Sequence, residues 1–429
     1  MPRHTGDAPG MRPDASLSYK NATMKHLRFM ACLLLLGCMV PATALCAGEH
    51  APKRSRGKGH DRPYSEAMYV KRQGGDLYIS AKLDERTFRR CMFNELYTFY
   101  RVGITRNRAA LPSTQPEAEP AVLLNSTYSD NIGPFAIPGC GWCGGNHKYR
   151  ERTARTARSE GYTLLADGTE GDTTLWANRV TVEAENVILD PTRPYRNVAG
   201  GEELRDTLCR ESVTYTVRRN NIEVAASHRF CNAAPVTIAI YYGMQSMFEG
   251  ETHVLTPGGA YTDWTEAAKA STFTKQEYPL FRRYVEKNRQ GYQSTWLLPD
   301  GLGDHALLDG QDDIFIYAPY GKSYHKLIGN KRMENGDKTC WRGVYTWFET
   351  PVADDADLLC YEGSAGGHTA VFIDCKRACK RTLALPGYLD LRHFGTAEQN
   401  SGIRISAAGR NKLKIKADAP GSCVLLLRE

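Results

Sequence analysis

The sequence of 429 residues lacks the motifs that mark several common enzyme chemistries. It contains no phosphate-binding glycine loop before a lysine, no Gly-x-Ser-x-Gly elbow, no His-Glu-x-x-His pair and no dinucleotide fingerprint. Its net charge of +7 is small for its length and gives no support for nucleic-acid binding. The sequence also has no evident internal repeat. Nothing in it therefore indicates a nucleotide-dependent enzyme, a zinc protease or a nucleic-acid-binding protein.

Convincing helical patterns are scarce, whereas the alternation typical of half-buried strands is frequent. Residues Arg219–Asn221 form a turn between two such segments, which predicts a β-hairpin. Short helices are expected only over Glu266–Ala270 and Leu280–Asn288. Strands are expected over Leu77–Leu83, Val180–Glu185, Val213–Arg218, Ile222–Phe230, Val236–Tyr241, Ile314–Tyr317, Ala370–Asp374, Ile403–Ser406, Leu413–Ile415 and Cys423–Leu427.

Strands of this length, separated by Gly, Asn and Asp turns, predict an all-β fold with an antiparallel, jelly-roll-like sandwich. We expect a main β-sandwich over residues 64–270, a linker with a short helix over 271–293 and a C-terminal β segment over 294–429. The C-terminal segment either forms a smaller sandwich of its own or completes the first one.

The first 47 residues have the composition of an upstream segment followed by a signal peptide. Lys25 and Arg28 form a basic region, Phe29–Val40 is an apolar run too short to span a bilayer, and Pro41–Ala47 is rich in small residues. Cleavage near Ala47 and lipidation of Cys38, which follows Leu-Leu-Gly, are both open. Residues 48–63 form a basic tether, so we expect a protein that is secreted, periplasmic or held at the outer cell surface.

Beyond residue 47 the chain has 50 basic and 46 acidic residues, a net charge of +4 that permits an acidic ligand without requiring one. Ten cysteines remain there, and an even number in an exported chain favours disulfides. Cys140 with Cys143 and Cys375 with Cys379 also have spacings found in metal sites, but neither has a matching second pair.

A glycine-rich loop is the densest candidate site in the sequence. It comprises Ser129–Phe135 and Gly141–His147 and ends with Asn146 and His147 side by side. Glycines let a substrate approach the backbone closely, which favours a binding loop containing Trp142, Asn146 and His147. The alternative is a structural loop that carries a surface histidine.

Two further segments carry aromatic and polar side chains. If Ile238 and Ile240 face the core, Tyr242 does too, and Tyr241 lies on the open face with Gln245. Lys322, Tyr324 and Arg342 come from strands rich in basic and aromatic residues and are candidate ligand contacts. Ordinary packing explains each of them equally well. His228 lies on an apolar strand face and is interpreted as a core histidine.

The runs Ser129–Phe135, Gly144–His147, Thr153–Thr156, Tyr241–Gln245 and Trp341–Gly343 resemble a family of secreted β-rich bacterial proteins with phage-associated relatives. One branch of this family is similar to polysaccharide lyases that cut chondroitin sulfate and hyaluronan. The similarity covers roughly residues 75–350. Cys140 and Cys143, which flank Trp142, are particular to this chain and leave the geometry before His147 in doubt.

The resemblance implies β-elimination on an acidic polysaccharide such as a glycosaminoglycan. This reaction needs a base, an acid and a group that neutralises the uronate carboxylate. His147, Tyr241 and Tyr242 are the candidate catalytic residues, because an unperturbed imidazole is mostly neutral at pH 7 and a phenol can exchange a proton. The candidate binding residues are Trp142, Asn146, Arg155, Gln245, Lys322, Tyr324 and Arg342.

No organic cofactor and no metal ligands are expected, although a divalent cation could neutralise the carboxylate. No nucleic-acid partner is expected, and contact with a membrane only through Cys38. Two other classes stay open. One is a non-catalytic glycan-binding lipoprotein, and the other is a glycoside hydrolase that uses two carboxylates, with Asp130, Asp263 and Glu266 as first candidates.

Overall fold

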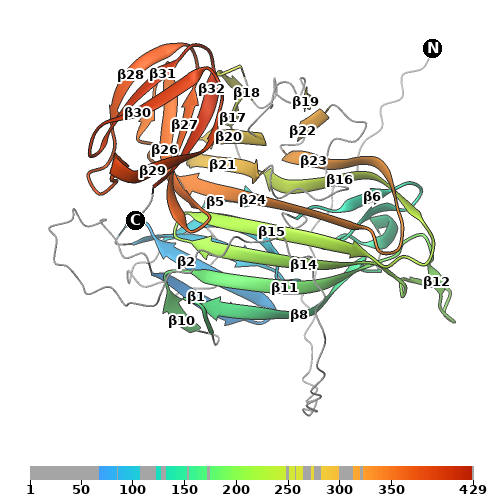
Figure 1. Cartoon of the computed structure of the whole chain (residues 1–429). Helices are drawn as coiled ribbons and strands as arrows, with labels where there is room; N and C mark the ends of the chain where they lie inside the picture. Colours follow the sequence, from blue (N-terminus) through green and yellow to red (C-terminus); the bar gives the residue numbers. More distant parts are fainter. Residues whose placement is uncertain are drawn as a thin grey trace, which may run out of the picture. The chain divides into compact units, whose positions relative to one another are not determined.

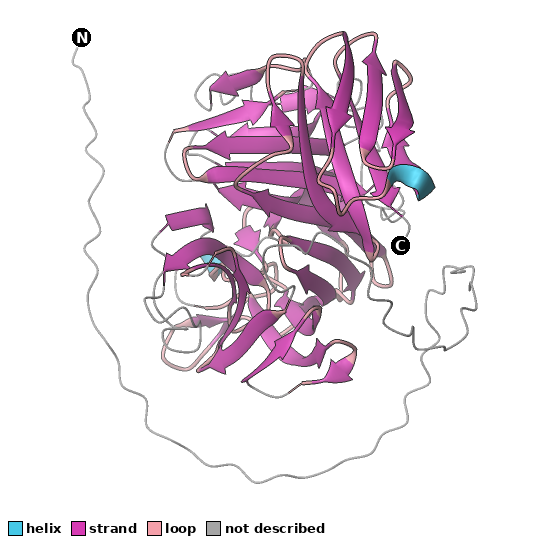
Figure 2. Ribbon diagram, turned by 90° about the vertical axis from the view of Figure 1, so that its left-hand side faces the viewer, coloured by secondary structure: helices cyan, strands magenta, loops and turns pink. Residues whose placement is uncertain are grey.

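The computed structural model describes residues 67–427 except 85, 107–121, 127–131, 152–153, 172–173, 248–250, 257, 264–271, 275–281, 299–312 and 319–321. Strands dominate this part of the chain (Figure 2), and its helical elements are two 3-10 turns, η2 (Tyr149–Glu151) and η4 (Leu391–His393). The predicted all-β fold with antiparallel sheets is therefore confirmed. Among the described residues no helix is long and apolar enough to cross a membrane.

A ten-stranded antiparallel sheet is the largest element of the fold, and its long strands lie side by side in Figure 1. Its centre contains the predicted hairpin, in which Arg218 pairs with Asn221 across the turn. In order across the sheet the strands are β18 (Tyr261–Asp263), β17 (Thr252–Leu255), β20 (Arg282–Asn288), β21 (Gly291–Leu298), β24 (Lys338–Phe348), β15 (Asn221–Phe230), β14 (Thr207–Arg218), β11 (Val180–Leu189), β8 (Ala157–Ala166) and β9 (Thr169–Glu170).

Two six-stranded sheets share an apolar core with the ten-stranded sheet. The first contains β10 (Thr174–Ala177), β1 (Met68–Gln73), β2 (Asp76–Lys82), β3 (Thr87–Phe93), β4 (Phe99–Arg106) and β5 (Val122–Ser126). The second contains β19 (Thr272–Thr274), β22 (Asp313–Ala318), β23 (Lys322–Met333), β16 (Val236–Met247), β6 (Phe135–Ile137) and β7 (Gly141–Cys143). A short ribbon of β12 (Tyr195–Arg196) and β13 (Glu202–Glu203) extends from the body.

The last part of the chain forms two smaller sheets. One contains β25 (Ala353–Asp354), β26 (Leu358–Ala365), β27 (His368–Cys375), β32 (Gly421–Leu427) and β29 (Phe394–Gln399), and the other β28 (Cys379–Ala384), β31 (Lys412–Ala417) and β30 (Ile403–Gly409). The strands β21, β22, β23 and β24 belong to the main sheets, whereas the strands within residues 353–427 pair only with one another.

Burial follows the alternation that the sequence predicts. In β11 the side chains of Val180, Val182 and Ala184 are buried while Glu183 and Glu185 are exposed. The buried side chains join one large apolar cluster formed by both six-stranded sheets and the ten-stranded sheet. Each fully buried valine or leucine contributes roughly 1.5–3 kcal/mol to folding.

Residues 282–288 are a strand, β20, and not the short helix expected over Leu280–Asn288; Glu266–Ala270 lies outside the described residues. Tertiary burial is the physical reason. Tyr284 packs into the main core, Val285 packs into a second apolar cluster, and the segment pairs along its length with β21. Side-chain burial on both faces of a sheet thus outweighs the helical propensity of the Arg, Glu and Lys residues in this segment.

A buried ion pair joins β20 to the C-terminal sheets. The Arg283 guanidinium donates to both oxygens of Asp374 in β27, at 2.8 and 2.5 Å, and to the Tyr361 hydroxyl of β26 at 2.6 Å. The Arg283 side chain is 1% exposed and that of Asp374 is 10% exposed. Ser422 donates a further hydrogen bond to Asp374, so the buried carboxylate accepts three hydrogen bonds, two from Arg283 and one from Ser422.

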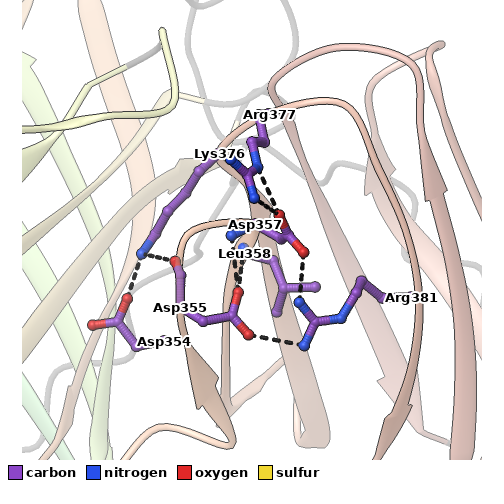
Figure 3. A network of polar contacts seen from close by, with 7 residues as sticks. All are labelled: Asp354, Asp355, Asp357, Leu358, Lys376, Arg377 and Arg381. Carbon is purple, nitrogen blue, oxygen red and sulfur yellow. Dashed lines mark hydrogen bonds and ion pairs between the residues drawn. The ribbon is translucent and has the colours of Figure 1, made fainter.

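A second polar network lies at the surface of the C-terminal sheets (Figure 3). Asp357 accepts hydrogen bonds from Arg377 and Arg381, each at 2.6 Å, and Asp355 accepts another from Arg381 at 2.9 Å. Lys376 donates to Asp354 and to the carbonyl of Asp355. These contacts tie the β25–β26 loop to the connection between β27 and β28.

All ten cysteines of the described residues are free thiols, so the structure contains none of the expected disulfides. Cys375 and Cys379, at the two ends of the β27–β28 connection, are within hydrogen-bonding contact of each other. Among the described residues no group of His, Cys, Asp and Glu is arranged to hold a metal ion.

Candidate functional site

Four of the predicted side chains form one row, which we call the aromatic row: His147, Trp142, Tyr242 and Tyr324. The ring centroids of His147 and Trp142 are 6.3 Å apart, and those of Trp142 and Tyr242 are 5.5 Å apart. Tyr242 stacks on Tyr324 at 3.8 Å. The structure therefore brings together residues from the glycine-rich loop, from β16 and from β23, up to 182 positions apart in the sequence.

Sheet pairing explains the row. Trp142 in β7 lies opposite Ala136 in β6, and Ala136 lies opposite Ile240 in β16, so these positions share one face across three strands. Tyr242 lies opposite Lys326 in β23. Residues 322, 324 and 326 alternate with buried Ser323 and His325, so Lys322 and Lys326 lie on the same face as Tyr324. Sequence reasoning selected Lys322 but missed Lys326, which the same alternation could have identified.

Exposure changes along the aromatic row. Tyr242 and Tyr324 are only 9% and 5% exposed, whereas Trp142 and His147 are half-buried and Asn146 is exposed. A ligand at the surface would therefore meet Trp142, Asn146 and His147 first. Lys322 and Lys326 are half-buried and add positive charge to this face.

The backbone that carries His147 is held in place by Thr156, which is fully buried. The Thr156 hydroxyl donates to the His147 carbonyl at 2.7 Å and accepts from the Gly144 amide at 3.0 Å. The amides of Thr156 and His147 donate to the carbonyls of His147 and Gly144. A fixed backbone limits the positions open to the imidazole, as a catalytic or binding loop requires.

Gly133 fixes the other side of the loop. Its φ is +93°, and a Cβ added there would lie 1.6 Å from the carbonyl oxygen of Tyr242. Only glycine allows this approach. The side-chain amide nitrogen of Gln245 lies next to Gly133, and Gln245 is 2% exposed. The main-chain carbonyl of Gln245 accepts a hydrogen bond from the Tyr345 hydroxyl. Gln245 thus lies beneath the loop and not on an open face as expected.

Tyr241 and Tyr242 face opposite to the expected directions. Tyr241 is fully buried in the main core, where its hydroxyl accepts a hydrogen bond of 2.7 Å from Trp341. Ile238 and Tyr241 both belong to this core although they are three residues apart. The alternation of β16 therefore changes phase between them, and Tyr242 emerges on the other face beside Ile240. The structure does not bring Tyr241 to the aromatic row.

The two predicted arginines lie elsewhere. Arg155 is exposed and forms an ion pair of 2.8 Å with Glu95. Arg342 is exposed on β24, on the face opposite to buried Trp341. His228 is a buried histidine, as expected, with its Nε2 3.0 Å from Glu211. Neither arginine belongs to the aromatic row in this arrangement.

A buried polar cluster, which the sequence did not reveal, lies on the other face of β16 and β23. It comprises Ser246, Tyr284, Glu286 and Ser323, with the His325 ring 5.5 Å from that of Tyr284. The Ser246 hydroxyl lies 2.7 Å from the Tyr284 hydroxyl and 2.8 Å from the Ser323 hydroxyl. It also lies 3.0 Å from the Glu286 carboxylate. Recognition of β20 as a strand would have placed Tyr284 and Glu286 on one face.

Burial raises the pKa of the Glu286 carboxyl to about 7, and hydrogen bonds from Ser323 and Ser246 only partly oppose it. The folded protein therefore holds this proton between about pH 4.5 and 7, where the unfolded chain releases it. The contribution of Glu286 to the free energy of unfolding therefore falls as the pH rises through this window and does not change further above it. The free energy of unfolding lost across this window amounts to roughly 3 kcal/mol, because each pKa unit corresponds to about 1.36 kcal/mol.

We expect Glu286→Gln to remove this dependence, because an amide of the same shape does not ionise. The free energy of unfolding of the variant, measured by chemical denaturation at a series of pH values, should exceed that of the unchanged protein above pH 7. Glu170→Gln, at an exposed position, serves as the control and should leave the profile unchanged. Parallel profiles for the Glu286 variant and the unchanged protein would contradict the assignment.

No protein-family model matches the chain, and no curated protein matches it in sequence. Among solved structures it is similar to the galactosidase domain of an α-galactosidase–sucrose kinase (9% identity, 63% of this chain and 40% of that chain, TM-score 0.33). It is also similar to a glycoside hydrolase family 97 enzyme from a Pseudoalteromonas species (10%, 66% and 36%, 0.30) and to a heparan sulfate lyase from Pedobacter heparinus (8%, 70% and 40%, 0.28).

These solved structures are carbohydrate-processing enzymes by their descriptions, both hydrolases and lyases. This chain spans about two fifths of their length. The TM-scores are too low to transfer a function, so the function has to be derived from the chain's own residues.

Proposed function

We propose that this protein binds an acidic polysaccharide at the aromatic row and cleaves it by β-elimination, with a glycosaminoglycan such as chondroitin sulfate or hyaluronan as substrate. The observation that supports the proposal is the proximity of His147, Trp142, Tyr242 and Tyr324 on one sheet face. The half-buried Trp142 can pack against a sugar ring, and Lys322 and Lys326 supply positive charge for sulfate or carboxylate groups.

The reaction would use these residues in distinct roles. His147 takes the proton next to the uronate carboxylate, and Asn146 beside it donates a hydrogen bond to that carboxylate. The Tyr242 hydroxyl supplies a proton to the departing glycosidic oxygen. The bond to that oxygen breaks as the carbon–carbon double bond forms, so the products are a new chain end and an unsaturated uronate.

The test is the ultraviolet absorbance of the unsaturated product after purified protein is mixed with chondroitin sulfate, hyaluronan and uronate homopolymers. An increase with at least one polymer supports the lyase. Retention of a polymer without absorbance or new ends would instead establish a glycan-binding protein in which the largely buried Tyr242 has no catalytic role. New reducing ends without absorbance would indicate a hydrolase. Of its first candidates, Asp263 lies exposed on β18, and Asp130 and Glu266 lie outside the described residues.

Export to an oxidising compartment belongs to the same proposal, with either cleavage near Ala47 or lipidation at Cys38. In that compartment Cys375 and Cys379 are the pair best placed to form a disulfide. The intact mass of protein recovered from its producing cells, without reductant, tests both points. Each disulfide removes two hydrogens and a lipid adds its acyl mass. A full-length chain with all thiols reduced would contradict export.

A further inference from the structure

A pocket of about 380 Å³ lies where the end of β24 meets β3, the turn after β14, and β26. Arg89, Trp347, Glu349, Glu362 and Tyr388 are among the residues that line it. None of them belongs to the aromatic row, which is built on β7, β16 and β23. Ligand pockets typically measure about 300–1,000 Å³, so this one is of a size to hold a small ligand.

Two buried donor groups belong to residues that line this pocket. The Arg89 side chain is 3% exposed, donates to Glu349 and to the carbonyl of Arg219, and has an Nε without a partner among the described residues. The Nε1 of Trp347, which is fully buried, likewise has none there. Both atoms are enclosed by the protein, so a ligand in the pocket would contact the other polar groups of the lining residues and not these two nitrogens.

The acceptors at the pocket are two carboxylates. Glu349 pairs with Arg89, and Glu362 accepts a hydrogen bond from the Tyr388 hydroxyl. A carboxylate can accept about four hydrogen bonds, so Glu349 retains capacity for a ligand's hydroxyl groups. Arg89 and Arg219 balance the charges of Glu349 and Glu362. The pocket therefore attracts neither an anion such as a uronate nor a metal cation by net charge.

We propose that this pocket binds a neutral saccharide unit. A sugar ring presents vicinal hydroxyls that each donate and accept, which matches a pocket lined by two carboxylates, an arginine and a tyrosine hydroxyl. This binding site is additional to the proposed lyase function and does not depend on it, because binding at the pocket needs no catalytic group.

The experiment is saturation-transfer NMR of the full protein with glucose, galactose, N-acetylglucosamine, N-acetylgalactosamine and, as a charged comparison, glucuronate. We expect saturation of at least one neutral sugar and a weaker signal from glucuronate. Tyr388→Phe and Glu362→Gln each remove one group with little change of shape. They should weaken the affinity by about tenfold, the factor that the loss of one hydrogen bond to a charged group produces.

Unfolding curves show whether both variants remain folded, and His147→Ala, at the other site, should bind the sugar normally. Saturation of none of the neutral sugars would overturn the proposal, as would equal binding of glucuronate or unchanged affinity in both folded variants. Loss of binding in His147→Ala would place the sugar on the aromatic row and would also overturn it. Each of these outcomes is independent of the absorbance assay for the lyase.

Discussion

Replacing Asp374 by alanine is expected to lower the free energy of unfolding by about 3–5 kcal/mol, because it leaves the buried Arg283 guanidinium without its counter-charge. The two hydrogen bonds between Arg283 and Asp374 lie at the junction of β20 with β27, where the guanidinium is almost completely shielded from water. Urea denaturation followed by circular dichroism measures the change. Because total stabilities are commonly about 5–15 kcal/mol, the effect would be a large fraction of the whole.

Asp418→Ala is the matched control. Asp418 pairs with Arg404 at 2.8 Å, but both side chains are more than half exposed, and such pairs contribute at most about 1 kcal/mol. The double variant Arg283→Met with Asp374→Leu should recover much of the loss, since buried ion pairs can be replaced by apolar side chains of similar volume. A loss below about 1 kcal/mol in Asp374→Ala would show that the pair is hydrated in solution.

His147→Ala is expected to lower the rate of the proposed β-elimination by about 10²–10⁴-fold, the usual contribution of a general base. Thr156 holds the backbone at residue 147 through main-chain contacts, so the variant should keep its circular dichroism spectrum and stability. His368→Ala, at an exposed histidine of β27, should retain full activity. Full activity in His147→Ala would move the base to another residue.

Tyr241 and Tyr242 provide an internal test of the two faces of β16. Tyr242→Phe removes the proposed acid and should reduce the rate while leaving stability nearly unchanged. Tyr241→Phe leaves the buried Trp341 N–H without its acceptor, so it should lower the free energy of unfolding by about 1–3 kcal/mol and spare the rate. If Tyr241→Phe were instead the inactive, stable variant, the sequence-based orientation would be correct and the structural one wrong.

The fold could be predicted from local sequence patterns, namely the alternation of apolar and polar residues and the turn residues. In β11, Val180, Val182 and Ala184 alternate with polar residues, and period two alone identifies both the strand and its buried face. The hairpin of β14 and β15 could be predicted in the same way, because its turn residues and both strands are contiguous. The candidate loop could be found from its glycines, because Gly133 is needed for a close backbone approach.

Features that depend on distant neighbours could not be predicted. The segment of β20 is rich in Lys and Arg, and only packing of Tyr284 and Val285 against other sheets makes it a strand. The change of phase in the alternation of β16 before Tyr241 could not be predicted from the sequence either. One irregular position moves every later side chain of the strand to the opposite face. The pocket depends on Arg89 and Glu349, which lie 260 positions apart.

The order of strands in the large sheet also has a consequence for synthesis. β15 ends at Phe230, but the strand that pairs with its second edge, β24, begins only at Lys338. During translation that edge stays open while more than a hundred further residues are made, and open edges recruit the wrong strands. β20 and β21 reach β15 only through β24, so a chain that ends before Lys338 lacks the strand that hydrogen-bonds the two halves of the sheet together.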